Sequence, residues 1–289
     1  RAILDGEHGS LGQQLAGLLS QPAALPPLEP TLGLAVYADE AAPVARPTDL
    51  QFDNGLGGFA HTGDEYVLYL HPRIAGGLPP APWINVLSNA DFGALVSESG
   101  GGYSWAENSG ENRLTPWRND PVSDRPAEAL YLRDEETVAI WSPWPQPAPD
   151  AEPYLVRHGL GYSTSEHHSF GLRQETRLFV ARDAPVKVVR LRLENTTQRP
   201  RRLTATYYVE WVLGVEREGA QLTLIPDYDD ATYTLLARNP YSFDFGERVA
   251  FLSCSKRPHG LTADRSEFLG RHGQLDRPAA MQRVGLEGR

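Results

Sequence analysis

The chain has 289 residues, of which 40% are hydrophobic and 22% are charged. This composition is typical of a folded chain of one large or two small domains, and it excludes disordered and collagen-like sequences. The formal net charge is −10, so the chain lacks the excess of basic residues that binding to a phosphate backbone requires. Nucleic acid is therefore excluded as the expected partner.

The first element in the chain is a predicted helix. Residues 21–30 (QPAALPPLEP) are rich in proline and are expected to end the helix and form a stiff linker. We therefore predict an N-terminal helix and Pro-rich linker over residues 1–30, followed by a β-domain over residues 31–289. The apolar residues that recur at the helical spacings of three, four and seven are Ile3, Leu4, Leu11, Leu15, Leu18 and Leu19.

From about residue 31 the hydrophobic period changes from helical to two. In VKVVRLRLE (186–194) and RRLTATYYVEWVL (201–213), apolar residues alternate with polar ones over most of the run. Strict alternation of this length predicts half-buried antiparallel strands. The shorter predicted strands are 66–70, 83–88, 92–97, 129–133, 138–142, 154–158, 171–180, 221–225, 231–237 and 248–253.

The number of predicted strands determines the expected fold class. A dozen or more strands with almost no helix predict an all-β protein, a large two-sheet antiparallel β-sandwich (supersandwich) with a short N-terminal helical segment. The strand spacing is too irregular for a propeller, and the sequence contains no repeat of fixed period. The Pro-rich stretch 143–153 is either a domain border or a long loop within one sandwich.

The densest group of candidate binding residues falls in residues 97–136, where periodicity is weak. Functional side chains concentrate on loops that rigid sheets hold in place. A sugar stacks its C–H face on an aromatic ring, and its hydroxyls take hydrogen bonds from forked amide, carboxylate or guanidinium groups. The alternative is that the tryptophans pack under a long loop while the arginines pair with neighbouring carboxylates. The candidate sugar-binding residues are Trp105, Asn112, Arg113, Trp117 and Arg118.

Catalytic, metal and cofactor sites are not predicted from the residue pattern. A glycosidase acid pair needs two carboxyl groups about 5–9.5 Å apart, and no pair can be chosen by spacing alone. His167 and His168 are adjacent, so on a strand they face opposite sides and do not share a metal ion. The Gly-rich runs 53–59 and 99–103 lack the Lys-Ser/Thr of a phosphate loop and are interpreted as tight turns. The single cysteine, Cys254, is expected to be a buried thiol, and it excludes an intrachain disulfide.

Several long motifs resemble glycoside hydrolase family 94. The longest is PPAPWINVLSNADFGALVSESGGGYSWAENSGENRLTPWRNDPVSD at 79–124, followed by EALYLRDEE and RHGLGYS. The family contains inverting disaccharide phosphorylases and the phosphorylase-like region of cyclic β-1,2-glucan synthases. The motifs that are most similar to the glucan synthase branch are LQFDNGLGGF (50–59), RLTATYYVEWVLG (202–214), ARNPYSFDF (237–245) and DRSEFLGR (264–271).

The resemblance implies an architecture and a reaction for the whole enzyme. Family members begin with a β-sandwich and continue into an (α/α)6 barrel, which carries the Asp general acid and most phosphate ligands. This chain matches the sandwich, begins with Arg1 and ends before a barrel, so it is expected to be an inactive segment of a longer polypeptide. The implied reaction is inverting phosphorolysis of a β-glucoside, with inorganic phosphate as co-substrate and no cofactor.

The resemblance also implies partners for this segment. The expected partners are a β-glucan or glucoside, the helical barrel of the same polypeptide and, in some assemblies, a second copy of the chain. Trp105 would be a stacking platform, and Arg113 and Arg118 would hold hydroxyls or position a barrel loop. No apolar run approaches the roughly 18 residues of a membrane span. The resemblance to the cyclic synthases implies an inner-membrane parent, with this segment on its cytoplasmic side. A stand-alone β-glucan-binding module and a dimerisation domain remain the alternative hypotheses.

Overall fold

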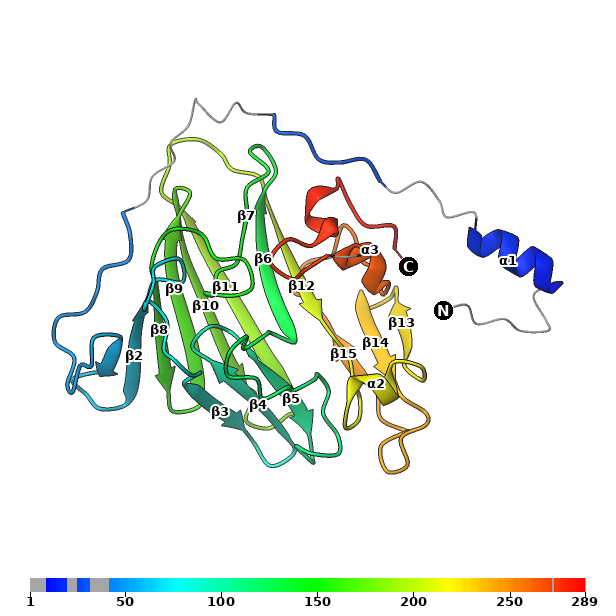
Figure 1. The fold of residues 1–289 in the computed structure, drawn as a ribbon, viewed down its shortest axis with the longest axis horizontal. Helices are drawn as coiled ribbons and strands as arrows, with labels where there is room; N and C mark the ends of the chain where they lie inside the picture. Colours follow the sequence, from blue (N-terminus) through cyan, green and yellow to red (C-terminus); the bar gives the residue numbers. More distant parts are fainter. Residues whose placement is uncertain (1–8, 20–24, 32–41, 272, 289) are drawn as a thin grey trace.

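The computed structural model describes residues 9–19, 25–31, 42–271 and 273–288. It contains a helix α1 at Leu11–Leu19 that stands apart from the sheets (Figure 1). Leu11 and Leu15 of this helix are 59% and 41% exposed, so these two side chains are not part of the core. Residues 1–8 and 20–24, which carry the rest of the predicted helix and part of the linker, lie outside the described residues.

The largest layer is a six-stranded antiparallel sheet in the order β1-β2-β8-β9-β10-β11. Its strands come from both halves of the chain, and β8 to β11 form a meander joined by short turns. The bounds are β1 Gly57–Phe59, β2 Glu65–Leu70, β8 Tyr154–Gly159, β9 Tyr162–Ser169, β10 Leu172–Val180 and β11 Lys187–Asn195.

Three smaller antiparallel sheets complete the β-structure, in the orders β3-β4-β5, β12-β6-β7 and β13-β14-β15. The first two lie over the large sheet, and the third lies to the side of β12 (Figure 1). The bounds are β3 Ile84–Ser88, β4 Phe92–Ser97, β5 Gly102–Ala106, β6 Glu128–Asp134, β7 Ile140–Trp141, β12 Leu203–Val209, β13 Ile225–Asp229, β14 Thr234–Arg238 and β15 Ala250–Leu252.

The core lies between the large sheet and the two small sheets that cover it. Leu68 and Val156 of the large sheet pack with Leu87 and Val96 of β3 and β4. Further along the same face, Leu172 packs with buried residues of the β12-β6-β7 sheet. The two small sheets therefore cover one face of the large sheet, which confirms the predicted all-β sandwich.

The C-terminal segment covers the outer face of β6 and β12. It contains the helix α3 (Arg265–Leu269) and the 3-10 turn η1 (Ala279–Gln282). The ring of Phe268 stacks on Tyr208 with the ring centroids 5.0 Å apart, and Tyr131 donates a hydrogen bond to the carbonyl of Leu275 at 2.7 Å. As a result, both faces of β6 are buried, which explains why its burial does not alternate.

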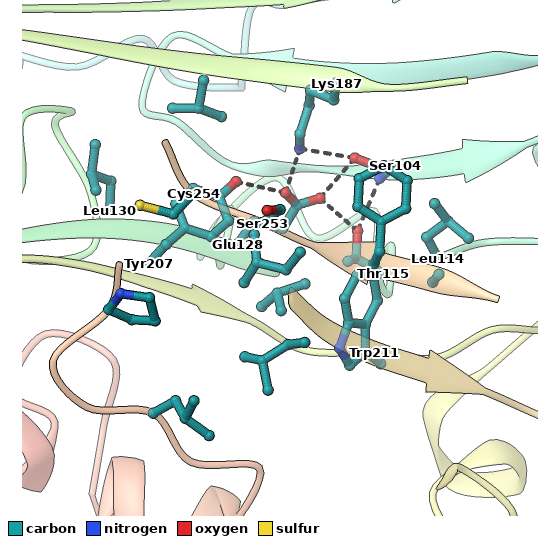
Figure 2. Close-up of a pocket in the computed structure, with 18 of the residues that line it drawn as sticks. Ser104, Leu114, Thr115, Glu128, Leu130, Lys187, Tyr207, Trp211, Ser253 and Cys254 are labelled. Carbon is teal, nitrogen blue, oxygen red and sulfur yellow. Dashed lines mark hydrogen bonds and ion pairs between the residues drawn. The ribbon is translucent and has the colours of Figure 1, made fainter. Parts of the chain in front are cut away.

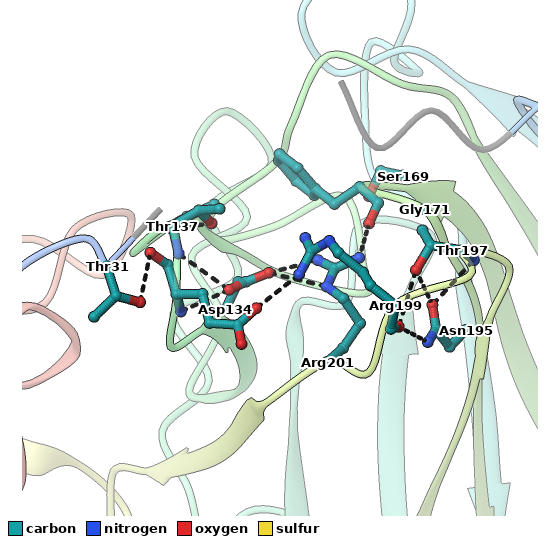
Figure 3. A network of polar contacts seen from close by, with 12 residues as sticks. Thr31, Asp134, Thr137, Ser169, Gly171, Asn195, Thr197, Arg199 and Arg201 are labelled. Carbon is teal, nitrogen blue, oxygen red and sulfur yellow. Dashed lines mark hydrogen bonds and ion pairs between the residues drawn. The ribbon is translucent and has the colours of Figure 1, made fainter. Parts of the chain in front are cut away.

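A polar network holds the connection between β11 and β12 against the second layer (Figure 3). The guanidinium of Arg201 pairs with Asp134 and donates to the carbonyl of Phe170 at 2.6 Å. Arg199 pairs with Glu136 at 2.7 Å. The side chains of Arg201 and Asp134 are almost fully buried, so this ion pair links the ends of three strands inside the protein.

The structure corrects several predicted strands and turns. The strand predicted to run through 201–213 ends at Val209, because the following residues turn away to pack on β14 and β15. The strand predicted at 221–225 begins at Ile225 instead. The Gly-rich runs 53–59 and 99–103 are only partly turns, since β1 and β5 begin inside them. The strand β9 was not among the predicted strands, although it carries the adjacent histidines on opposite faces as expected.

Candidate functional site

A cluster of aromatic rings lies around Tyr103 on one face of β5. The ring centroid of Tyr103 is 5.1 Å from Trp105 and 4.7 Å from Trp117, in tilted and edge-to-face arrangements. All three rings are only partly buried. The indole N–H groups of Trp105 and Trp117 make no hydrogen bond to other described residues, so they remain available as donors. The cluster combines apolar ring faces with polar edges, which is the combination that sugar recognition requires.

The position of Trp105 depends on a glycine in the neighbouring strand. Gly93 of β4 pairs directly with Trp105 of β5. A Cβ atom built on Gly93 would lie 2.1 Å from the indole ring, so any larger residue would displace the ring. The absence of a side chain at position 93 therefore lets the indole lie flat across β4.

The guanidinium of Arg113 lies beside the aromatic cluster. Its central carbon is 5.9 Å from the ring centroid of Tyr103, a cation–π distance. The same group donates hydrogen bonds to the carbonyls of Ser109 and Val215, both at 3.2 Å. Its main chain also bridges Trp105 and Gly214. Arg113 therefore links three segments, and some of its guanidinium N–H groups are already bonded to main-chain carbonyls.

The other two predicted residues are not among the ring contacts of this cluster. Asn112 is 4% exposed, and its amide donates to the carbonyl of Ala106 at 3.0 Å. Arg118 is exposed on the loop that carries Asp120, whose pKa is held below its ordinary value chiefly by the hydrogen bond from Ser123. The structure thus brings together Trp105, Arg113 and Trp117 around Tyr103, whereas Asn112 is bonded to the main chain and Arg118 lies on the exposed loop that follows Trp117.

A groove of about 1480 Å³ opens on the other side of β5 (Figure 2). Ser104 and Asn112 are among its lining residues, whereas Trp105 and Trp117 are not. Because successive side chains of a strand face opposite sides, β5 separates the aromatic cluster from the groove.

The inner end of the groove contains a buried polar network around Glu128. The carboxylate of Glu128 pairs with Lys187 and accepts hydrogen bonds from Ser104 at 2.7 Å, Thr115 at 3.1 Å and Tyr207 at 2.7 Å. Burial alone would raise the pKa of Glu128, but the Lys187 ammonium and these donors outweigh it and lower the pKa. Glu128 is therefore an internally neutralised carboxylate and not a proton donor.

Two further carboxyl groups are buried near the turn between β4 and β5. Glu98 accepts a hydrogen bond from the main-chain N–H of Trp83 at 2.7 Å, and Asp124 accepts from the hydroxyls of Ser97 and Ser99. Burial raises the pKa of Glu98 to about 7 and also raises the pKa of Asp124. Both groups anchor the turn through bonds to their neighbours.

Within the described part of the chain, no group of three or more His, Cys, Asp or Glu residues is arranged to hold a metal ion. None of the helices described there is long and apolar enough to cross a membrane. The thiol of Cys254 is exposed beside the groove, so the prediction of a buried cysteine was wrong.

Sequence reasoning missed Tyr103 as the centre of the aromatic cluster and Glu128 as the centre of the buried network. The run Gly102-Tyr103-Ser104-Trp105 contains a signal for the first, because Tyr103 and Trp105 are two residues apart and share a strand face. No local signal exists for the second, since Lys187 lies 59 residues from Glu128.

The two packed antiparallel layers, with an aromatic cluster beside them, define a β-supersandwich domain. Residues 65–289 match the family model of the glycosyl hydrolase 94 supersandwich domain. The chain belongs to the glycosyl hydrolase 94 family.

Relatives of the chain include a glucan synthase and several phosphorylases. The chain is 37% identical, over 97% of its length, to the cyclic beta-(1,2)-glucan synthase NdvB of Rhizobium meliloti (strain 1021). It is 37% identical over 54% of its length to the N,N'-diacetylchitobiose phosphorylase of Vibrio furnissii, and 26% identical over 79% to the solabiose phosphorylase of Paenibacillus borealis. It spans only 10%, 19% and 30% of these three proteins.

Proposed function

We propose that this chain is a non-catalytic scaffold within a glycoside phosphorylase-like enzyme of the cyclic β-1,2-glucan synthase type. The similarity to that synthase over nearly the whole chain supports the type of enzyme. The carboxylates Glu98, Asp124 and Glu128 are engaged with neighbouring donors, which supports a role without acid–base chemistry. A helical barrel of the same polypeptide would supply the general acid and bind phosphate for inverting phosphorolysis of a β-glucoside.

The observation that carries a sugar-contacting role is the partly exposed cluster of Tyr103, Trp105 and Trp117 with Arg113 beside it. The rings offer apolar faces to the C–H groups of a glucose unit, and the free indole N–H groups offer donors to its hydroxyls. In this proposal the cluster borders the bound glucan and the barrel. Arg118, on its exposed loop, would contact the barrel, and the sandwich would lie on the cytoplasmic side of the membrane.

The test uses the complete enzyme with Trp105→Ala, assayed for phosphate-dependent release of glucose 1-phosphate from β-1,2-glucan. Loss of a stacking ring is expected to raise KM for the glucan about fivefold or more, since a ring–sugar contact contributes on the order of 1 kcal/mol. KM for phosphate should not change. Trp105→Phe should restore most of the affinity, and Phe52→Ala, an exposed aromatic outside the cluster, should have no effect.

Other outcomes of this experiment separate the competing functions. An unchanged KM for the glucan in Trp105→Ala and in Tyr103→Ala would remove the cluster from the sugar-binding surface. Tight binding of β-1,2-glucan by residues 1–289 alone, measured by calorimetry, would favour a stand-alone binding module. Release of glucose 1-phosphate by residues 1–289 alone would contradict the non-catalytic role.

A further inference from the structure

Three strands from three different sheets border the groove, and each has one edge without a strand partner. β11 pairs only with β10, β12 only with β6, and β15 only with β14, within the described ranges. Residues of all three strands line the same groove. An unpaired strand edge presents a row of main-chain N–H and C=O groups that another strand can bind.

The side chains along the groove are mostly apolar. They come from β11, β12, β14, β15 and the segment after β12, so the apolar lining extends between the two unpaired edges of β12 and β15. The apolar lining residues on these strands and this segment include Leu191, Leu203, Val209, Trp211, Leu235 and Leu252. The indole of Trp211 lies among these side chains, next to the polar network (Figure 2). Apolar surface of this extent, beside open strand edges, favours burial by another part of a protein.

The polar groups at the inner end of the groove do not favour a sugar as its occupant. The Glu128 carboxylate already has Lys187, Ser104, Thr115 and Tyr207 as partners. The amide of Asn112 is bonded to the main chain in the same way. A hydroxyl-rich ligand needs unpaired donors and acceptors, whereas this network satisfies its own members.

The mouth of the groove is basic, in contrast to the chain as a whole, whose net charge is −10. The loop after β15 places Lys256, Arg257 and His259 along the lining. Of the acidic lining residues, Glu107 and Glu128 are paired with Arg248 and Lys187, which leaves Asp91 as the acidic side chain that no ion pair neutralises among the described residues. Charge complementarity therefore favours an occupant with acidic residues on its solvent-facing side.

We propose that an extended segment of the parent polypeptide, outside residues 1–289, inserts between β12 and β15 as an additional strand. Its apolar side chains would alternate inward over the groove and its acidic side chains outward, toward Lys256 and Arg257. The relatives that match this chain are three to ten times longer, so ample chain exists to supply such a segment. The proposal rests on the proposed function only in treating the chain as part of a larger enzyme.

The test compares amide hydrogen exchange in the complete parent protein with exchange in residues 1–289 alone. Strand addition would give new main-chain hydrogen bonds, so amides in 203–209 and 250–252 should exchange at least tenfold more slowly in the parent. The control is β3, whose outer edge is also unpaired in the described structure but which does not line the groove. Its exchange should be the same in both proteins.

A crosslink from Cys254 identifies the occupant. The thiol is exposed at the groove, so it can carry benzophenone maleimide in the parent after its other cysteines are replaced. Irradiation should join it to a segment outside residues 1–289 of the same molecule, with alternating apolar residues. The same label at Leu160→Cys, in a C254S background, should not reach that segment.

Equal exchange of β12 and β15 in the two proteins would overturn the proposal. Slower exchange of β3 in the parent, by the same factor as for β12 and β15, would also overturn it. So would a crosslink from Cys254 to a second copy of the chain. These readouts are independent of the glucan kinetics of Trp105 variants, so failure of the proposed function and failure of the added strand can be told apart.

Discussion

At the scale of single residues, one nearly fully buried ion pair links distant strands of this sandwich. Asp134 and Arg201 are 1% and 3% exposed at their side chains. Burial would raise the pKa of Asp134, but the hydrogen bonds from Arg201 and from the main chain of Glu136 and Thr137 outweigh it and lower the pKa. The pair is therefore charged inside the protein. Its contribution to the free energy of folding depends on both partners being present.

Replacing Asp134 with Asn should lower the free energy of unfolding by about 3–5 kcal/mol, because it leaves the guanidinium of Arg201 buried without its counter-charge. Denaturant unfolding measures this loss. The control is Glu175→Gln, which removes the partner of Arg190 in a largely exposed pair at 2.9 Å. That change should cost less than about 1 kcal/mol. A loss of similar size in both variants would contradict the interpretation.

Glu98 also makes the free energy of unfolding depend on pH. The direction is opposite to that expected from Asp134, because the pKa of Asp134 is lowered and the pKa of Glu98 is raised. Its pKa is raised to about 7 in the folded protein, so folding favours the protonated form. Its contribution is fully present below the ordinary carboxyl pKa and is lost as pH rises through about 7, a loss of about 3 kcal/mol. Glu98→Gln keeps an acceptor for the N–H of Trp83. In this variant the free energy of unfolding should depend less on pH between pH 5 and pH 8. Unchanged pH dependence in this variant would show that Glu98 is not the titrating group.

At the scale of elements, the position of the aromatic cluster follows from the pairing of β4 with β5. The register places Gly93 opposite Trp105, so the indole occupies the space above a residue without a side chain. The same strand β5 directs Ser104 into the groove on its other side. One strand register thus fixes both the candidate sugar-contacting surface and the wall of the groove.

Replacing Gly93 with Ala should displace the indole of Trp105 and cost about 1–3 kcal/mol, because the new methyl group overlaps the ring. A shift in tryptophan fluorescence and a loss of glucan affinity in the complete enzyme should accompany it. The control is Gly219→Ala in the short helix α2 (Arg217–Ala220), where an added Cβ meets no atom within 4 Å. If Gly93→Ala left fluorescence and stability unchanged, the packing of Trp105 on β4 would be refuted.

At the scale of the whole molecule, α1 and the sandwich make unequal contributions to stability. The sandwich buries its apolar residues between layers, whereas α1 leaves Leu11 and Leu15 largely exposed. Exposed apolar residues away from a core contribute little to folding. Through Leu11 and Leu15, α1 therefore contributes little to the core.

The double change Leu11→Asp and Leu15→Asp should alter the free energy of unfolding of residues 1–289 by less than about 0.5 kcal/mol. Thermal and denaturant unfolding measure this directly. A matched change in the core, Leu87→Ala, should cost about 2–5 kcal/mol because this side chain is buried between the layers. A large loss from the α1 variant would show that the helix packs on the sandwich in solution.

The pattern of alternating apolar residues was sufficient to predict the all-β sandwich and most of its strands, because strand formation and half-burial depend on a local period of two. The residue types in 97–136, where periodicity is weak, predicted a candidate site that contains Trp105, Arg113 and Trp117. The sequence could not show that Asn112 and Arg118 are outside the ring contacts of that site. The tertiary structure alone placed Lys187 against Glu128 and Gly93 under Trp105. Those contacts depend on strand register and on which layers face each other, and no local pattern encodes either.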